Sequence, residues 1–306
     1  MKRPIALNID DHTALVHVYR EHSSGFTKDG RPLSPFVPYE FLTYFCDVAE
    51  KYGLCGKLSF VPEPGCRGDI VHGLEGFTLE ALEQWKKTVL TRLPGFSLGA
   101  EMITHHHALN YLTGTWRDEN EDSWSRRQTR GTMTPYIAHA LRLLKEAGIP
   151  ATGVTSPWMF GSTVEEEYRA AIAAAMRDVF GVNQAWYFTW TKQEYPTICE
   201  PIPGFRLASV YSSTHDQLWK AIECPRADEA YVDQLADLYL TADGQSGAIV
   251  EILKKDAPVV ITAHWQTLYS NGTWCGARAI ERIAQRVEKL LPELEWTPFT
   301  RLAGME

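Results

Sequence analysis

Strand-like and helix-like segments alternate along the whole chain, and this alternation limits the folds available to it. Each short run rich in aliphatic or aromatic residues is followed by a longer stretch whose apolar residues have helical spacing. The clearest strands are expected at 4–9, 57–61, 96–104, 151–155, 185–191, 206–212 and 258–262. The clearest helices are expected at 39–52, 78–93, 134–147, 164–180, 228–239, 247–255 and 276–291. Repeated strand–helix units of this kind predict an α/β fold with a parallel sheet.

The number of these units favours a closed barrel over an open sheet. Seven or eight strand–helix units form a (β/α) barrel, regular or irregular, with the site at the carboxyl ends of the strands. The open, doubly wound alternative lacks its signature, because no GxGxxG sequence follows an early strand. We therefore expect a single domain over residues 1–306. The polar stretch 115–131, which contains Trp116 and Trp124, is expected to be a long loop on one face.

Charge and composition exclude several classes of partner. The formal net charge is −8, from 30 basic and 38 acidic residues, and no Lys/Arg-rich run suggests binding to nucleic acid. The six cysteines are irregularly spaced without a CxxC pair, so we expect them to be reduced. The N-terminus lacks the apolar stretch of a signal peptide, and no apolar run is long enough to cross a membrane. These features predict a cytoplasmic protein that acts on a small molecule, and they leave the oligomeric state open.

Polar and metal-competent residues gather where the predicted strands end. The segments concerned are Asp10-Asp11, His105-His106-His107, Ser156-Pro157-Trp158, Ser212 to Asp216, and His264-Trp265. Taken singly, an Asp pair can be a helix cap, a histidine run an exposed turn, and a lone histidine a structural group. Because the carboxyl ends of parallel strands meet at one edge of a sheet, their shared placement favours a common site.

Carboxylates and imidazoles in this combination suit a borderline divalent ion, Zn²⁺ above all. Such an ion lowers the pKa of a bound water molecule and polarises a carbonyl group. A second carboxylate close by can accept the proton of that water, and a histidine on the opposite side can protonate the leaving group. The residue types therefore predict metal-assisted hydrolysis.

The order of these segments resembles the polysaccharide deacetylase (NodB-homology) family, within the glycoside hydrolase/deacetylase barrels, in a divergent branch. The matching segments are Ile9-Asp10-Asp11, Glu101 to His105, Thr155 to Gly161, Asp216 to Trp219, and Ile261 to His264. The resemblance implies that Asp10 is the general base and His264 the general acid. It also implies that Asp11 and His105 are metal ligands.

The sequence departs from the family at the third metal ligand. The family's second ligand histidine follows the first by four residues, and that position holds Leu109 here. His107 would share a face with His105 if the strand continued, so His107 is the expected third ligand. His106 and Asn110 are the alternatives.

A second departure concerns the arginine of the family's third motif, which is replaced by Ser or Thr. Arg67, in a loop after another strand, is expected to take its place. Substrate contacts are expected from Pro157, Trp158, Trp265 and Tyr269, because aromatic side chains beside motif residues can stack on sugar rings.

Three functions are consistent with these residues. The first is a metal-dependent hydrolase that removes an acyl group, such as acetyl, from a carbohydrate-like substrate. The second is a glycosidase that uses paired carboxylates from among Asp10, Asp11, Glu101 and Asp216 without a catalytic metal. The third is a carbohydrate-binding protein that keeps the barrel without catalysis.

Overall fold

A nine-stranded, mostly parallel sheet organises the protein in a computed structural model that describes residues 2–13, 17–189 and 196–305. The strands lie in the order β10-β11-β9-β8-β5-β2-β1-β12, and β13 pairs with β1. Their bounds are β1 Arg3–His12, β2 Gly56–Phe60, β5 Phe96–Glu101, β8 Gly153–Thr155, β9 Gln184–Phe188, β10 Thr197–Cys199, β11 Arg206–Ser209, β12 Val259–His264 and β13 Leu294–Trp296. All of these pairs are parallel except β10 with β11. The predicted parallel α/β sheet is confirmed, although Trp190 and Thr191 of the strand expected at 185–191 lie outside the described residues.

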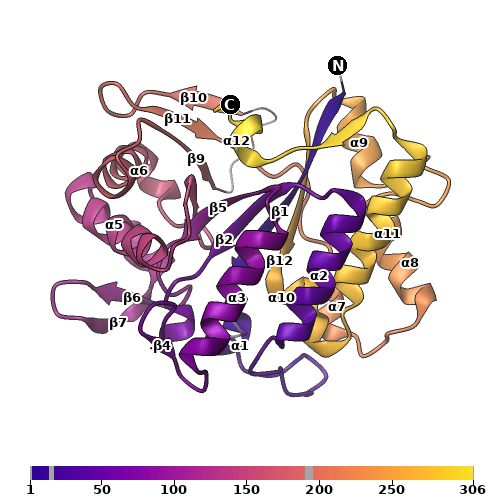
Figure 1. Ribbon diagram of the computed structural model, residues 1–306, viewed down its shortest axis with the longest axis horizontal. Helices are drawn as coiled ribbons and strands as arrows, with labels where there is room; N and C mark the ends of the chain where they lie inside the picture. The colour runs from indigo at the N-terminus through magenta and orange to yellow at the C-terminus, as the bar shows by residue number, and fades with distance from the viewer. Residues whose placement is uncertain (1, 14–16, 190–195, 306) are drawn as a thin grey trace.

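Helices cover the sheet on three sides in the view of Figure 1. Helices α5 and α6 lie on the left, α2 and α3 in front, and α8, α9 and α11 on the right. The long helices are α2 Tyr39–Tyr52, α3 Leu79–Arg92, α5 Arg130–Glu146, α6 Glu165–Phe180, α8 Glu229–Asp237, α9 Ala248–Lys254 and α11 Cys275–Leu290. The short ones are α1 Val18–His22, α4 Glu121–Ser125, α7 Trp219–Glu223, α10 Trp265–Tyr269 and α12 Phe299–Leu302. None of the helices in the described part of the chain has the length and apolar character needed to cross a membrane.

Helix α2 illustrates how the sequence pattern produces these elements. Its apolar residues recur every three or four positions, so that Phe41, Phe45 and Val48 all face the sheet and are buried. The helix ends at Gly53, whose backbone adopts the left-handed conformation with φ 61°. Glycine reaches this conformation without steric cost, and the pattern therefore determines both the buried face and the end of the helix.

Strands β11 and β12 lie at the two ends of the parallel part of the sheet. The segment that follows β11 forms hydrogen bonds with β12. The backbone N–H groups of Ser213 and Thr214 donate to the carbonyl oxygen of Val260 on β12, at 3.1 and 3.2 Å. The N–H of Thr262 donates to Oγ1 of Thr214 at 3.0 Å. In the described residues this gap is bridged by a turn and side chains instead of a strand ladder, an arrangement compatible with an irregular barrel.

A tryptophan fills the inner face of the sheet near the amino ends of its strands. Trp186 on β9 packs against Phe299 of α12, with ring centroids 5.6 Å apart, and both side chains are fully buried. A Cβ atom on Gly153 would lie 2.2 Å from the Trp186 ring, and one on Gly99 would lie 2.6 Å from it. Glycine is therefore required at these two strand positions because the indole occupies the space of a side chain.

The stretch 115–131 differs from the loop expected there. It begins with β7 (Thr115–Asn120), which pairs with β6 (His107–Asn110), and continues through α4 into the first turn of α5. Most residues of β7 are exposed on both faces. A solvated hairpin of this kind lacks the apolar alternation by which strands are recognised in sequence, so its residues are typical of a loop.

Replacing Gly153 by alanine is expected to destabilise the fold by about 1–3 kcal/mol, because overpacking forces the Trp186 ring or the backbone to move. Urea denaturation measures the change. Gly131→Ala in α5 is the control, because its Cβ would meet only Oγ1 of Thr129 at 3.7 Å. We expect that control to be as stable as the original or up to about 1 kcal/mol more stable. Equal effects of the two substitutions would contradict the packing role of Gly153.

Candidate functional site

A bulge at the end of β1 brings Asp10 and Asp11 to the same cavity. Successive side chains of a regular strand point to opposite faces of a sheet. The pairing of β1 with β2 shifts register between Ile9 and His12, and Asp11 adopts a left-handed backbone with φ 58°. Both carboxylates consequently line one cavity, which a regular strand would not allow.

The turn after β5 is held by one buried carboxylate. Glu121, at the start of α4, accepts hydrogen bonds from the backbone N–H groups of Ile103 at 2.9 Å, Thr104 at 3.1 Å and His105 at 2.8 Å. The Tyr136 hydroxyl donates to the same carboxylate at 2.7 Å. His105 has a left-handed backbone, with φ 51°. These bonds support that conformation and fix the direction of the His105 side chain.

Three side chains converge where a metal ion could bind: Asp11, Glu101 and His105, all buried. His105 Nε2 lies 2.9 Å from Asp11 Oδ1 and 3.8 Å from Glu101 Oε1. Ligands about 2.1 Å from one ion, in octahedral or tetrahedral geometry, lie roughly 3.0–3.4 Å from each other. The donor atoms therefore have the chemistry and nearly the spacing of a divalent metal site.

Glu101 lies where the sequence led us to expect His107. Strand β5 ends at Glu101 and not at residue 104, and the chain turns sharply through Met102, whose φ is 45°. His107 consequently belongs to the β6–β7 hairpin, and it does not share a strand face with His105. Neither His107 nor its alternatives His106 and Asn110 line the cavity.

The charges in this cluster favour a bound cation. Burial alone would raise the pKa of Asp11, but the charges of His105 and His264 and the hydrogen bonds from His105 and Gln266 together lower it well below the usual range. Burial and the charges of Asp11 and Asp10 raise the pKa of Glu101 well above its ordinary value. The cluster therefore disfavours a negative charge on Glu101, and a divalent ion bound between Asp11 and Glu101 would stabilise that charge.

Asp10 is paired with a lysine that sequence reasoning did not single out. Lys57 on β2 is fully buried, and its Nζ donates to Asp10, Ser59 and, at 2.7 Å, Oγ1 of Thr155. Nδ2 of Asn8 donates to the other Asp10 oxygen at 3.2 Å. A lone lysine within a strand of otherwise small and apolar residues was the available signal, because a charge in such a strand needs a buried partner.

His264, at the end of β12, is oriented by Asp216. Nδ1 of His264 lies 2.7 Å from Oδ2 of Asp216, which also accepts hydrogen bonds from the His264 N–H and from Oγ1 of Thr267. Burial disfavours the imidazolium, but the hydrogen bond to Asp216 and the nearby carboxylates raise the pKa of His264 to about 9. The side chain is therefore a protonated acid at neutral pH.

These groups line one cavity of about 350 Å³ at the carboxyl ends of β1, β5, β8 and β12. Its lining residues are Asp10, Asp11, Tyr19, His22, Glu101, His105, Ser156, Trp158, Trp219 and His264. Of the residues predicted from sequence, the structure brings together Asp10, Asp11, His105, Trp158 and His264. Tyr19 and His22 come from α1 and had no recognisable signal in the sequence.

Four other predicted contacts lie away from the cavity. Trp265 is 2% exposed and packs on His12, with ring centroids 4.3 Å apart. Tyr269 is buried in the same core, and Pro157 does not line the cavity. Arg67 donates to Glu21 at 2.7 Å. Gln266, which was not predicted, is buried and donates from Nε2 to Asp11 Oδ2, so it orients that carboxylate.

Solved structures with a similar fold include a Mycobacterium smegmatis protein described as a polysaccharide deacetylase. The TM-score is 0.57 at 10% identity, and the alignment covers 100% of this chain and 91% of that chain. A family 4 carbohydrate esterase from Streptomyces lividans, in complex with acetate, has a TM-score of 0.42 at 13% identity, covering 95% and 90%. A GH57-type branching enzyme from Pyrococcus horikoshii has a TM-score of 0.49 at 12% identity, covering 99% and 70%.

The likeness to the M. smegmatis protein shows a shared fold over the whole chain. No protein-family model matches the sequence, and no curated protein sequence matches it. The structural comparison therefore supports the fold alone, and the reaction is inferred from the residues of the site.

Lys57→Met is expected to lower the free energy of unfolding by about 3–5 kcal/mol, because it leaves the Asp10 carboxylate buried without its ammonium partner. Adding Asp10→Asn to this variant should restore part of the loss. Urea denaturation of the single and double variants measures both effects. The control is Lys51→Met, which breaks the exposed pair with Glu281. A loss for Lys57→Met no larger than for that control, about 0–1 kcal/mol, would contradict the role of the pair.

The His264 ring of the metal-free protein should titrate near pH 9, and Asp216→Asn should bring its pKa back towards 6.5. Histidine ring resonances in NMR spectra measure both values. A raised pKa stabilises the fold below the ordinary value, and this contribution is lost as the pH rises through the folded-state pKa. Asp216→Asn should therefore reduce stability more at about pH 6 than at about pH 10. Titration near 6.5 in both proteins would exclude the proposed pairing.

Proposed function

We propose that this protein is a metal-dependent hydrolase that removes an acyl group, such as acetyl, from a carbohydrate-like substrate. The observation that carries the proposal is the convergence of Asp11, Glu101 and His105 in a cavity that also holds Asp10 and His264. A divalent metal ion held by side chains, a further carboxylate and a protonated imidazole together can hydrolyse an amide or ester. The fold shared with the M. smegmatis protein supports the same class of reaction.

Asp11, Glu101 and His105 would hold the metal. One imidazole and two carboxylates suit Zn²⁺, and three protein ligands leave a position open for water and substrate. A divalent metal, when bound, supplies a water molecule of lowered pKa and polarises the acyl carbonyl. Gln266 keeps one oxygen of Asp11 occupied by a hydrogen bond, so the other oxygen faces His105 and the ion.

Asp10 and His264 would move the protons. Asp10 accepts the proton of the attacking water, and Lys57 and Asn8 hold its carboxylate in place through hydrogen bonds. His264 donates its proton to the departing nitrogen or oxygen, because its raised pKa keeps it protonated before the reaction. Asp216 stabilises the imidazolium through a hydrogen bond with Nδ1, and the other ring nitrogen, Nε2, takes no part in that bond.

A glycosidase mechanism fits this arrangement less well. Paired catalytic carboxylates of glycosidases lie about 5–9.5 Å apart, on opposite sides of the bond that is cut. Asp11 and Glu101 instead converge on one imidazole, with His105 Nε2 2.9 Å from Asp11 Oδ1 and 3.8 Å from Glu101 Oε1, and Asp216 is hydrogen-bonded to His264. Carboxylates so close together favour a shared cation.

Metal content provides the first test. Protein loaded with Zn²⁺ and dialysed should retain about one ion per chain, measured by elemental analysis, because three charged or imidazole donors converge. Asp11→Asn, Glu101→Gln and His105→Ala should each lose the ion, whereas His107→Ala, in the hairpin, should retain it. Loss of the ion in His107→Ala together with retention in Glu101→Gln would reverse the ligand assignment.

Acetate release provides the second test. The zinc-loaded protein should release acetate from N-acetylated or O-acetylated sugars without forming new reducing ends. His264→Ala should keep its metal and lower kcat by about 10²–10⁴, because it removes the general acid. New reducing ends would support a glycosidase. Metal binding and sugar binding with no acetate release from any acetylated sugar would support a binding protein.

A further inference from the structure

Six aromatic rings form a continuous wall around the cavity, which we call the aromatic wall. In order, they are Trp158, His105, His22, Tyr19, Trp219 and His264. The ring centroids of successive members lie 4.1, 4.9, 5.5, 5.0 and 4.9 Å apart. No member is separated from the next by another side chain at these distances. Rings therefore make up six of the ten residues that line the cavity, and His105 joins this wall to the carboxylates through its contact with Asp11 at 2.9 Å.

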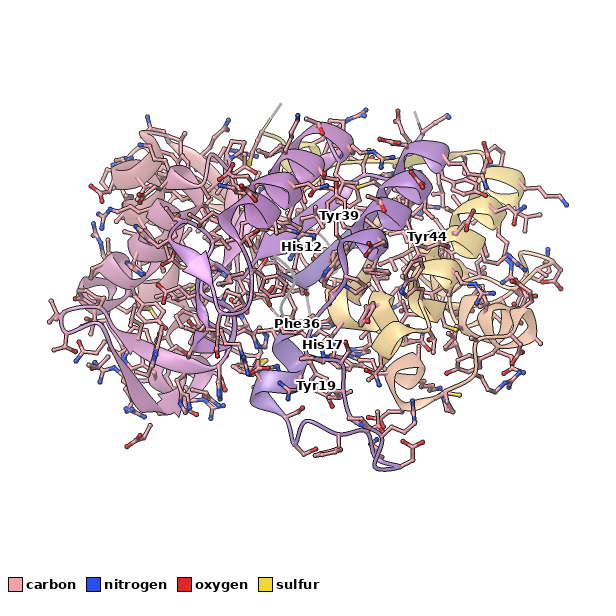
Figure 2. The ribbon with its side chains drawn as sticks, turned by 60° about the horizontal axis from the view of Figure 1, so that its bottom comes forward. His12, His17, Tyr19, Phe36, Tyr39 and Tyr44 are labelled. Carbon is pink, nitrogen blue, oxygen red and sulfur yellow. The ribbon has the colours of Figure 1, made fainter. Side chains whose placement is uncertain are left out.

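Two members of the aromatic wall come from α1, the short helix between β1 and α2. Figure 1 shows α1 at the end of the molecule opposite the N-terminus, and Figure 2 labels Tyr19 on this helix and His12 at the end of β1. The helix therefore lies beyond the carboxyl end of β1, and its Tyr19 and His22 side chains line the cavity.

An ion pair fastens α1 in this position. Nε of Arg67 donates to Glu21 at 2.7 Å, and Nη1 of Arg20 donates to the same carboxylate at 2.9 Å. A Cβ atom on Gly65 would lie 2.6 Å from the Glu21 side chain, so α1 packs directly on the backbone of the turn Pro64–Cys66. Arg67 therefore holds α1, with its two members of the aromatic wall, in place from outside the cavity.

The size and charge of the cavity limit what it can hold. Its volume of about 350 Å³ is at the lower end of the roughly 300–1,000 Å³ range of small-molecule pockets. Among the described residues that line it, three are carboxylates and none is lysine or arginine. With a divalent ion bound, Asp11 and Glu101 would offset the ion, while Lys57 offsets Asp10 and Asp216 offsets His264, so no unpaired cation among these described residues would remain for a phosphate or carboxylate on the substrate.

We propose that the aromatic wall restricts the site to a single neutral sugar ring, so that the substrate is a small acylated saccharide and not the interior of a polysaccharide. This inference rests on the proposed function. The rings of Tyr19, Trp158 and Trp219 provide apolar faces for stacking on the sugar. Helix α1, fastened by Glu21 and Arg67, blocks continuation of a polymer chain.

The test compares N-acetylglucosamine with its β-1,4-linked tetramer on the zinc-loaded protein. If acetate is released, kcat/KM is measured for both sugars. If none is released, the sugars remain intact and their Kd values are measured by calorimetry. We expect the monosaccharide to be favoured by about tenfold or more, because the wall makes a steric clash with the longer chain. The 6-phosphate of N-acetylglucosamine should be a poorer ligand than the neutral sugar.

Arg67→Gln should bring the preference for the monosaccharide over the tetramer, as the ratio of kcat/KM values or of affinities, closer to one, because it releases α1. Tyr19→Ala is the second variant and should act in the same direction by shortening the wall. Arg92→Gln is the matched control: Arg92 has the same side-chain exposure of 29% and pairs with Asp47 and Glu50 on the surface. It should leave the ratio unchanged, and thermal melting checks that all three variants fold.

Four results would overturn the inference. The first is a kcat/KM or affinity for the tetramer that equals or exceeds that for the monosaccharide in the unmodified protein. The second is an unchanged ratio of these values in both Arg67→Gln and Tyr19→Ala. The third is no binding of either sugar, and the fourth is tighter binding of the phosphate ester than of the neutral sugar. Absence of acetate release combined with preferential binding of the monosaccharide would overturn only the proposed hydrolase activity. The inference about the single-ring site would then stand.

Discussion

The buried ion pair between Lys57 and Asp10 sets the character of the inner face of the sheet. Both charged side chains are almost completely removed from water, with 0% and 3% exposure. Desolvation of two ions is offset only when the remaining donors and acceptors are also satisfied. Ser59, Thr155 and Asn8 supply those partners. The carboxyl half of the inner face is consequently polar, and the position of Asp10 is fixed by strands and not by loops.

The two halves of the inner face have opposite chemistry. Towards the amino ends of the strands, Trp186 and Phe299 fill the space with apolar rings. Towards the carboxyl ends, the backbone leaves the preferred regions at Asp11, His105 and Trp158, which have φ values of 58°, 51° and 48° and all line the cavity. Each such conformation costs about 1–3 kcal/mol, which the well-packed half of the fold has to offset.

The sequence predicted the parallel sheet because its main strands and long helices have clear local patterns, as in α2, whereas the short strands β10 and β13 do not. It also predicted that Asp11, His105 and His264 meet, because the carboxyl ends of parallel strands share one edge. The position of Glu101 beside His105 could not be predicted, because it depends on where β5 ends. That point is set by Glu121, which is 16 residues away from His105 and accepts its N–H. Similarly, a lysine in a strand does not reveal its partner until the neighbouring strands are placed.

The β6–β7 hairpin is closed at its base just beside the candidate metal site. The Glu121 N–H donates to the carbonyl oxygen of His106 at 3.1 Å, while the Glu121 carboxylate holds the turn that carries His105. Between these two contacts, the hairpin begins against the core, where Ala108 and Leu109 are buried, and its exposed part then returns to the same place. Insertions or deletions at the exposed tip around Leu112 can therefore accumulate in evolution without displacing His105. The hairpin is a region where homologous chains can diverge in length while keeping the same chemistry.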